Sequence, residues 1–182
     1  IHAYDAELLD GPIVVRMAAE GEKLTTLDDV VRPLHPDDLL ITDASGPIGL
    51  AGVMGGATTE LSESTGNVVI EAAHFDAMTI ARTSRRHKLS SEASRRFERG
   101  VDPQASYAAA HRVAELLVEH AGGTLLAEET VRGTVPARAS TTIEDTLPTR
   151  ILGTDVDHSA AVRLLQAIGA TVSDHGDSLT IT

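Results

Sequence analysis

Residues 71–103 read EAAHFDAMTIARTSRRHKLSSEASRRFERGVDP and contain the start signals of two consecutive short helices. Asp76 is suited to cap the first helix, because its carboxylate can accept hydrogen bonds from the free N–H groups of the first turn. Ser90 or Ser91 can cap the second helix in the same way. An apolar strand is expected directly before, at residues 67–71. This run therefore predicts a strand followed by a pair of helices.

The flanking residues supply further strands and one longer helix. Strand candidates lie at 11–17, 38–43 and 46–53, and the last of these is rich in glycine, which favours bulges or a close backbone approach. A longer helix is expected to end at Gly122, and a strand is expected at 124–129. The elements predict an α/β chain of the α+β kind, with a mixed, largely antiparallel sheet and helices packed on it.

The domain organisation is suggested by a change in the apolar pattern. Residues 134–146 lose the rhythm of the preceding elements, and we interpret them as a linker after a first domain at 1–133. Residues 147–182 are expected to form a helix, capped by Asp157, and a strand pair. This small α+β module is too short for a comfortable core of its own. We therefore expect it to be incomplete and the chain to be an excised piece of a longer protein.

The composition excludes several classes of protein. The chain is 42% hydrophobic but has only two Phe, two Tyr and no Trp, so its core must consist mainly of aliphatic side chains. No apolar run approaches the roughly 18 residues that span a bilayer, so no membrane association is expected. The absence of cysteine excludes disulfides and thiolate metal sites and is typical of a cytoplasmic protein.

The charge is unevenly distributed along the chain. The formal net charge is −12, yet residues 82–99 hold seven of the 15 basic residues and carry +5, which leaves −17 for the remainder. An acidic chain of this kind is not expected to bind nucleic acid, DNA included, non-specifically, but one local basic face could steer a phosphate backbone to a single place. The alternative is that these side chains pair with neighbouring carboxylates and helix ends.

Most catalytic and cofactor motifs are missing from the sequence. The glycine cluster at 49–56 has neither the spacing of a phosphate loop nor that of a dinucleotide fold, and it forms either a tight turn or the lining of a cleft. His2, His74 and His87 lack metal-ligand spacing, so no metal site is expected. No Gly-x-Ser-x-Gly elbow is found, which disfavours a serine hydrolase.

Glu71 is the carboxylate that most needs a partner. It ends an apolar strand, where an unpaired charge is unfavourable by a few kcal/mol. Two readings stay open: Glu71 accepts a hydrogen bond from a ligand hydroxyl or ammonium, or it forms a salt bridge with one of the basic residues at 82–99.

Three motifs together resemble one family. GVMGG at 52–56, VIE at 69–71 and the long run from Arg85 to Pro103 are similar to the beta subunit of bacterial phenylalanine–tRNA ligase. HAYD at 2–5 and the strand after Pro12 fit the same family, and the similarity spans essentially the whole chain. The resemblance implies that residues 1–133 are the C-terminal portion of an editing domain, which hydrolyses tyrosine wrongly esterified to the phenylalanine tRNA. Residues 147–182 would begin the next module.

The resemblance also implies an editing pocket. Glu71 would accept the hydroxyl of the mischarged tyrosine, and Gly55 would line the pocket. Ser91 and Ala93 would shape the wall near the amino-acid moiety, and Ser91 stands where some members carry threonine. His2 would lie near the ester as the catalytic candidate, and a positioned water would attack the ester bond.

The partners implied by the resemblance are the mischarged tRNA and an alpha subunit, in an alpha2-beta2 heterotetramer. Arg85, Arg86 and Lys88 are the candidates nearest to the RNA. No cofactor is expected in this segment, because the ATP and Mg²⁺ of the full ligation reaction would bind elsewhere. The competing interpretation is a non-catalytic structural or RNA-docking module of the synthetase.

Overall fold

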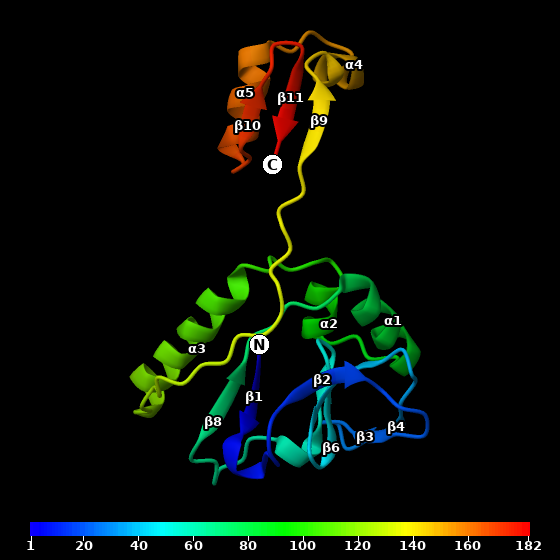
Figure 1. Cartoon of the computed structure of the whole chain (residues 1–182), viewed down its shortest axis with the longest axis vertical. Coiled ribbons are helices and arrows are strands. Elements are labelled where there is room, and N and C mark those ends of the chain that lie inside the picture. Colours follow the sequence, from blue (N-terminus) through cyan, green and yellow to red (C-terminus); the bar gives the residue numbers. More distant parts are fainter. The chain divides into compact units, whose positions relative to one another are not determined.

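The computed structural model describes residues 1–182, and the chain divides into two units, Ile1–Gly133 and Thr134–Thr182. Every strand pairing in both units is antiparallel, and helices accompany the sheets (Figure 1). The predicted α+β class is therefore confirmed. None of the helices is long and apolar enough to cross a membrane.

The strands of the first unit form three small sheets rather than one. The largest has the order β2-β5-β6-β7, and the others are the pairs β1-β8 and β3-β4. The pair β1-β8 joins the start of the chain to the strand that ends at Glu71. The bounds are β1 (His2–Asp5), β2 (Val14–Met17), β3 (Lys23–Thr25), β4 (Val31–Pro33), β5 (Leu39–Asp43), β6 (Gly46–Leu50), β7 (Met54–Gly55) and β8 (Val68–Glu71).

Two helices of the first unit begin at the caps that the sequence predicts. The Asp76 carboxylate accepts from the N–H of Thr79 at 2.7 Å, and the Ser91 hydroxyl accepts from the N–H of Ser94 at 3.0 Å. Gly122 ends the longest helix in the left-handed conformation, with φ of 67°. The bounds are α1 (Ala77–His87), α2 (Glu92–Phe97) and α3 (Ala105–Ala121), with 3₁₀ turns η1 (Ala6–Leu8) and η2 (Ala57–Thr59).

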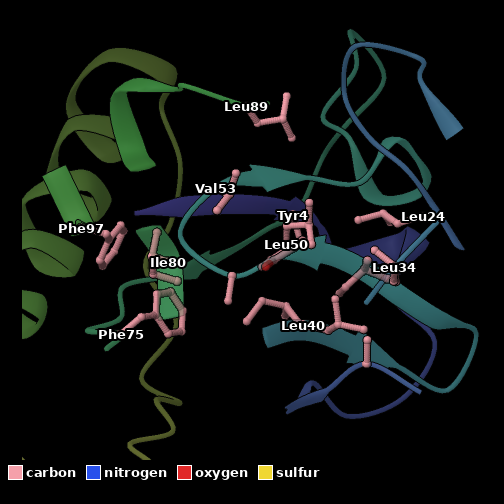
Figure 2. Packing of buried hydrophobic residues seen from close by; sticks show 14 residues of the cluster. Tyr4, Leu24, Leu34, Leu40, Leu50, Val53, Phe75, Ile80, Leu89 and Phe97 are labelled. Atoms are coloured by element: carbon pink, nitrogen blue, oxygen red, sulfur yellow. The ribbon is translucent and has the colours of Figure 1, made fainter. Parts of the chain in front are cut away.

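The core of the first unit lies between the larger sheet and the helix pair α1–α2 (Figure 2). Phe75 and Phe97 pack with ring centroids 5.3 Å apart, and Ile80 lies beside them. Gly52 has φ of +65°, and a Cβ there would be 3.1 Å from both rings. The chain therefore needs a glycine at the turn between β6 and β7, where the two aromatic side chains close over the backbone.

A buried carboxylate fastens α1 to the loop before β5. Asp38 is fully buried and accepts from the Arg86 guanidinium, from the N–H of His35 at 2.8 Å and from Thr83 at 3.2 Å. His87 Nε2 lies 2.6 Å from Asp38 Oδ2, the oxygen that also accepts from the N–H of His35. Burial alone would raise the pKa of Asp38, but these hydrogen bonds and the neighbouring positive charges lower it overall. The end of α1 is therefore held by charge as well as by apolar packing.

The second unit is a three-stranded sheet with two helices, in the strand order β10-β11-β9. The Asp157 carboxylate accepts from the N–H of Ala160 at 2.9 Å, which confirms the predicted cap of α5. Strand β9 lies inside the range 134–146, which we interpreted as a linker, so that interpretation was wrong for these residues. The bounds are β9 (Thr141–Glu144), α4 (Leu147–Leu152), α5 (His158–Ala167), β10 (Val172–Asp174) and β11 (Ser178–Ile181).

The strand expected at 124–129 is absent, and that prediction was wrong. The segment pairs with no sheet, and Leu125 and Leu126 are 58% and 70% exposed. An apolar run forms a strand only where another strand offers it an edge, and no edge in the first unit pairs with this run.

Candidate functional site

The pairing of β1 with β8 builds the site. His2 is directly opposite Glu71 in the register, and Tyr4 is opposite Val69. Because side chains alternate along a strand and opposed residues share a face, His2, Tyr4 and Glu71 lie on the same side of the pair. The pairing thus brings together the imidazole of His2, the phenol of Tyr4 and the carboxylate of Glu71, which lies far from the other two in the sequence.

Tyr4 is bound to Glu71 through its hydroxyl. The Tyr4 O–H donates a hydrogen bond to Glu71 Oε2, and Tyr4 is only 1% exposed. Burial, followed by the adjacent Glu71 charge, raises the pKa of Tyr4 well above its ordinary value. Tyr4 is therefore a neutral donor at any physiological pH, and Glu71 accepts a phenol hydroxyl from within the chain itself.

His2 fits between Tyr4 and Gly55. The His2 and Tyr4 rings meet edge to face with centroids 4.6 Å apart. On its other side, a Cβ at Gly55 would be only 2.4 Å from His2 Cε1. Only glycine admits the imidazole here. Burial lowers the pKa of His2, and the nearby Glu71 charge offsets this only in part, so the ring is neutral near pH 7.

These residues line a small hollow of about 60 Å³. The hollow has room for a few water molecules and is smaller than the roughly 300–1,000 Å³ of typical small-molecule sites. An aromatic ligand would therefore have to displace lining side chains, and Met54, which is half-buried, is the most adaptable of them. The lining residues are Ile1, His2, Tyr4, Ile41, Gly49, Leu50, Ala51, Gly52, Val53, Met54, Gly55, Glu71, Ala93 and Phe97.

Of the five pocket residues expected from the resemblance, the structure brings four to this hollow and places Ser91 behind it. His2, Gly55, Glu71 and Ala93 line the hollow. The Ser91 hydroxyl donates to the backbone carbonyl of Val53 at 2.7 Å while it caps α2. Its donor hydrogen and one of its two acceptor lone pairs are thus used within the fold. Ser91 holds the wall residue Val53 and is not itself one of the residues that line the hollow.

The three RNA-proximal candidates have different surroundings. The Arg86 guanidinium is paired with the buried Asp38. Lys88 is exposed and ends α1 in the left-handed conformation, with φ of 54°. Arg85 is exposed and lies with Arg99 in a separate groove of about 340 Å³ between α1 and the end of α2.

Sequence reasoning missed Tyr4 as a member of the site. It stands two residues after His2 on a strand, so both side chains lie on one face whenever that strand forms. This spacing was available in the sequence. The partner of the Tyr4 hydroxyl was not, because Glu71 is 67 positions away along the chain.

The polar groups that the side chains of the site offer determine its possible chemistry. Glu71 Oε1 receives no hydrogen bond from the chain, whereas Oε2 is occupied by Tyr4. Neutral His2 can accept a proton from a water molecule. No group of three or more His, Cys, Asp or Glu side chains is placed to hold a metal ion. The arrangement therefore offers one free carboxylate oxygen and one imidazole around a small space.

Comparisons with known proteins relate the chain to one family. Residues 1–122 match the family model of the B3/4 domain. The chain is 56% identical over 179 residues to the phenylalanine–tRNA ligase beta subunit of Cutibacterium acnes, covering 98% of this chain and 21% of that protein. It is 52% identical over 183 residues to the beta subunit of the same name from Thermobifida fusca, covering 100% of this chain and 22% of that protein.

The chain was also compared with solved structures. One match is an N-terminal fragment of the phenylalanyl-tRNA synthetase beta subunit from Pyrococcus horikoshii, with a TM-score of 0.43 and 12% sequence identity. The match covers 99% of this chain and 52% of that chain. The sequence matches confirm the resemblance inferred from the motifs. The chain spans about a fifth of the length of the curated relatives it matches.

Proposed function

The chain belongs to the B3/4 domain family, and from that premise we propose that it is the segment of a phenylalanine–tRNA ligase beta subunit that hydrolyses tRNA mischarged with tyrosine. The observation that supports this most directly is that Glu71 already accepts a hydrogen bond from a phenol, that of Tyr4. A carboxylate that binds one phenol hydroxyl, and has a second oxygen free, is chemically suited to recognise the hydroxyl of tyrosine.

The physical need for such a site follows from the limits of a phenylalanine pocket. An apolar pocket rejects a ligand that merely adds a hydroxyl by only about 100-fold. A second site can instead select for that hydroxyl. A hydrogen bond to a carboxylate contributes roughly 1.5–3 kcal/mol, and phenylalanine cannot form it. Glu71 would thus direct tyrosine, and not phenylalanine, to hydrolysis.

The proposed reaction is attack of a water molecule on the ester between tyrosine and the terminal ribose. The water oxygen bonds to the carbonyl carbon, the ester C–O bond breaks, and a proton passes to the departing ribose oxygen. His2 is the candidate base, because burial keeps its imidazole neutral near pH 7 and it lines the same hollow as Glu71. Backbone N–H groups of the glycine-rich lining would stabilise the oxyanion.

The proposed RNA contact is the groove that contains Arg85 and Arg99. Neither guanidinium forms an ion pair or a side-chain hydrogen bond within the chain, so both are free to bind phosphate oxygens. Lys88 is exposed at the end of the same helix and would add to this positive surface. Arg86 is not part of the proposed contact, because its guanidinium is paired with the Asp38 carboxylate.

The remaining activities of the full enzyme are assigned to other parts of it. We propose that ATP-dependent attachment of phenylalanine takes place in another part of the full enzyme, in an alpha2-beta2 assembly with an alpha subunit. Within this segment, no group of three or more His, Cys, Asp or Glu side chains is placed to hold a metal ion. The cytoplasm, where tRNA is charged, is the proposed location.

The decisive experiment is Glu71→Gln in the complete synthetase that contains this chain. We expect clearance of Tyr-tRNA to fall by about 10–100-fold, which corresponds to the loss of one charge-assisted hydrogen bond, while phenylalanine charging persists. Glu63→Gln is the matched control, because Glu63 is exposed on a loop away from the hollow. Clearance by Glu71→Gln at the wild-type rate would overturn the proposal. Binding of mischarged tRNA without any hydrolysis by the wild type would favour a docking module instead.

A further inference from the structure

We propose that Tyr4 is a positioning residue for Glu71: its hydroxyl holds Oε2 and so fixes the orientation of the carboxylate, whose Oε1 receives no hydrogen bond from the chain and can accept one from the hydroxyl of an incoming phenol. This inference rests on the proposed function and adds a residue that determines its specificity. The hydrogen bond in question joins Tyr4 of β1 to Glu71 of β8. The resemblance assigned a role to Glu71 but none to Tyr4.

Tyr4 is held in place on several sides. Its side chain is 1% exposed and belongs to the main hydrophobic cluster, where Figure 2 shows it beside Leu50. The ring of His2 packs edge to face against it, and His2 is in turn pressed against Gly55. The Tyr4 hydroxyl therefore occupies a fixed point in the fold.

No other group of the chain fixes the Glu71 carboxylate. Glu71 is the last residue of β8, it is half-buried, and Tyr4 is the only group that donates a hydrogen bond to its side chain. No salt bridge reaches it, although the sequence left that possibility open. A glutamate has several rotamers, so without Tyr4 its carboxylate would sample orientations in which neither oxygen faces the hollow.

The Tyr4 hydroxyl positions the Glu71 carboxylate without blocking it. A phenol hydroxyl that occupied the only acceptor would compete with a tyrosine ligand. A carboxylate, however, has two oxygens with about four lone-pair sites, and the chain uses only Oε2. A ligand can therefore be received at Oε1 while the bond to Tyr4 is kept. If Tyr4 positions Glu71, removing its hydroxyl should lower the rate of Tyr-tRNA deacylation. If Tyr4 competes with the ligand, removing its hydroxyl should raise that rate.

Tyr4→Phe in the complete synthetase tests the proposal, because it deletes the hydroxyl and keeps the ring that packs against His2. We expect kcat/KM for Tyr-tRNA deacylation to fall about 3–10-fold, mainly through KM, since an oriented acceptor contributes to binding. The slow deacylation of Phe-tRNA should not change. Tyr107→Phe is the matched control, because Tyr107 is 58% exposed on α3 and its hydroxyl forms no hydrogen bond. An unchanged or increased kcat/KM for Tyr4→Phe would overturn the proposal.

The double variant Tyr4→Phe, Glu71→Gln distinguishes positioning from a general structural effect. If Tyr4 acts through Glu71, its substitution should have no further effect once the carboxylate is gone. An equal loss in both backgrounds would overturn the proposal, because it would show that Tyr4 only supports the fold. The two hypotheses also fail separately: wild-type clearance by Glu71→Gln would overturn the proposed function, whereas an impaired Glu71→Gln with an unimpaired Tyr4→Phe would overturn only the role of Tyr4.

Discussion

The imidazole of His2 lies directly against the Cα of Gly55, and a Cβ at that position would be 2.4 Å from His2 Cε1 and 2.6 Å from Nε2. Gly55→Ala must therefore displace the ring from Tyr4 and from the hollow. We expect a loss of about 1–3 kcal/mol in the free energy of unfolding, as for other overpacked sites, measured by urea denaturation.

The double variant His2→Ala, Gly55→Ala identifies the contact responsible. Removing the imidazole makes room for the new methyl group, so the additional loss caused by Gly55→Ala should be smaller in the His2→Ala background. If the two losses simply add, the clash is with another neighbour, and the His2–Gly55 contact does not explain the need for glycine.

Arg86→Ala should be more destabilising than Arg85→Ala, although both residues lie on α1. Arg86 is paired with the fully buried Asp38, and removing one partner leaves a charge without its principal counter-ion. We expect a loss of about 2–3 kcal/mol, somewhat below the usual range for a buried pair, because His87, Thr83 and the N–H of His35 still donate to Asp38.

Arg85→Ala serves as the control because Arg85 is exposed and forms no ion pair within the chain. Its free energy of unfolding should change by no more than about 0.5 kcal/mol. In the complete synthetase, Arg85→Ala should instead be the variant with the larger effect on tRNA affinity. It should weaken binding and reduce the salt dependence of binding. Equal stability of the two variants would contradict the structural role assigned to Arg86.

The second unit should show a pH dependence that comes from His158. Its Nε2 lies 2.7 Å from Asp174, and its Nδ1 lies 3.4 Å from Asp145. The hydrogen bond that His158 donates to the Asp174 carboxylate is the main cause that raises the pKa of His158 above its ordinary 6.5. The same bond lowers the pKa of Asp174. The stabilisation from His158 is therefore fully present below pH 6.5 and is lost as the pH rises through the pKa of the folded state.

The contribution of Asp174 has the opposite sign. It is present above the ordinary pKa of 3.8 and is lost as the pH falls through the lowered value. The pair should thus contribute most between about pH 4 and 6.5. An NMR titration of the His158 ring protons checks this, with Asp174→Asn expected to move the pKa of His158 back toward its ordinary value. An unchanged titration in Asp174→Asn would contradict the assignment.

Local signals explain which parts of the fold could be predicted. The caps at Asp76, Ser91 and Asp157 each bind a backbone N–H three residues ahead, so their sequence context contains all the partners. Strands depend on distant partners. Residues 124–129 are apolar but find no edge, whereas the short β9 forms because Ile143 pairs with Leu179 of β11. Neither result could be obtained from the residues of the segment itself.

The same distinction applies to the site. The family resemblance led to His2, Gly55, Glu71 and Ala93, and the structure brings these four residues to one hollow. The resemblance gave no indication that Tyr4 would bind Glu71, because that contact depends on the register of β1 against β8. The paired state of Arg86 was equally inaccessible, since Asp38 is 48 positions away along the chain.

Ser91→Ala should affect stability more than substrate selection, because the Ser91 hydroxyl is used within the fold. It accepts from the N–H of Ser94 at 3.0 Å and donates to the carbonyl of Val53 at 2.7 Å. Losing the cap and one buried hydrogen bond should lower the free energy of unfolding by about 1–2 kcal/mol, measured by urea denaturation. Ser91→Thr keeps the hydroxyl and should lose far less. Ser90→Ala is the control, because Ser90 is exposed and the only side-chain hydrogen bond of its hydroxyl is the one that it accepts from the exposed Arg95. If Ser91→Ala instead abolished the preference for Tyr-tRNA over Phe-tRNA while stability was retained, Ser91 would have to contact the substrate directly, and the hollow would extend beyond Val53.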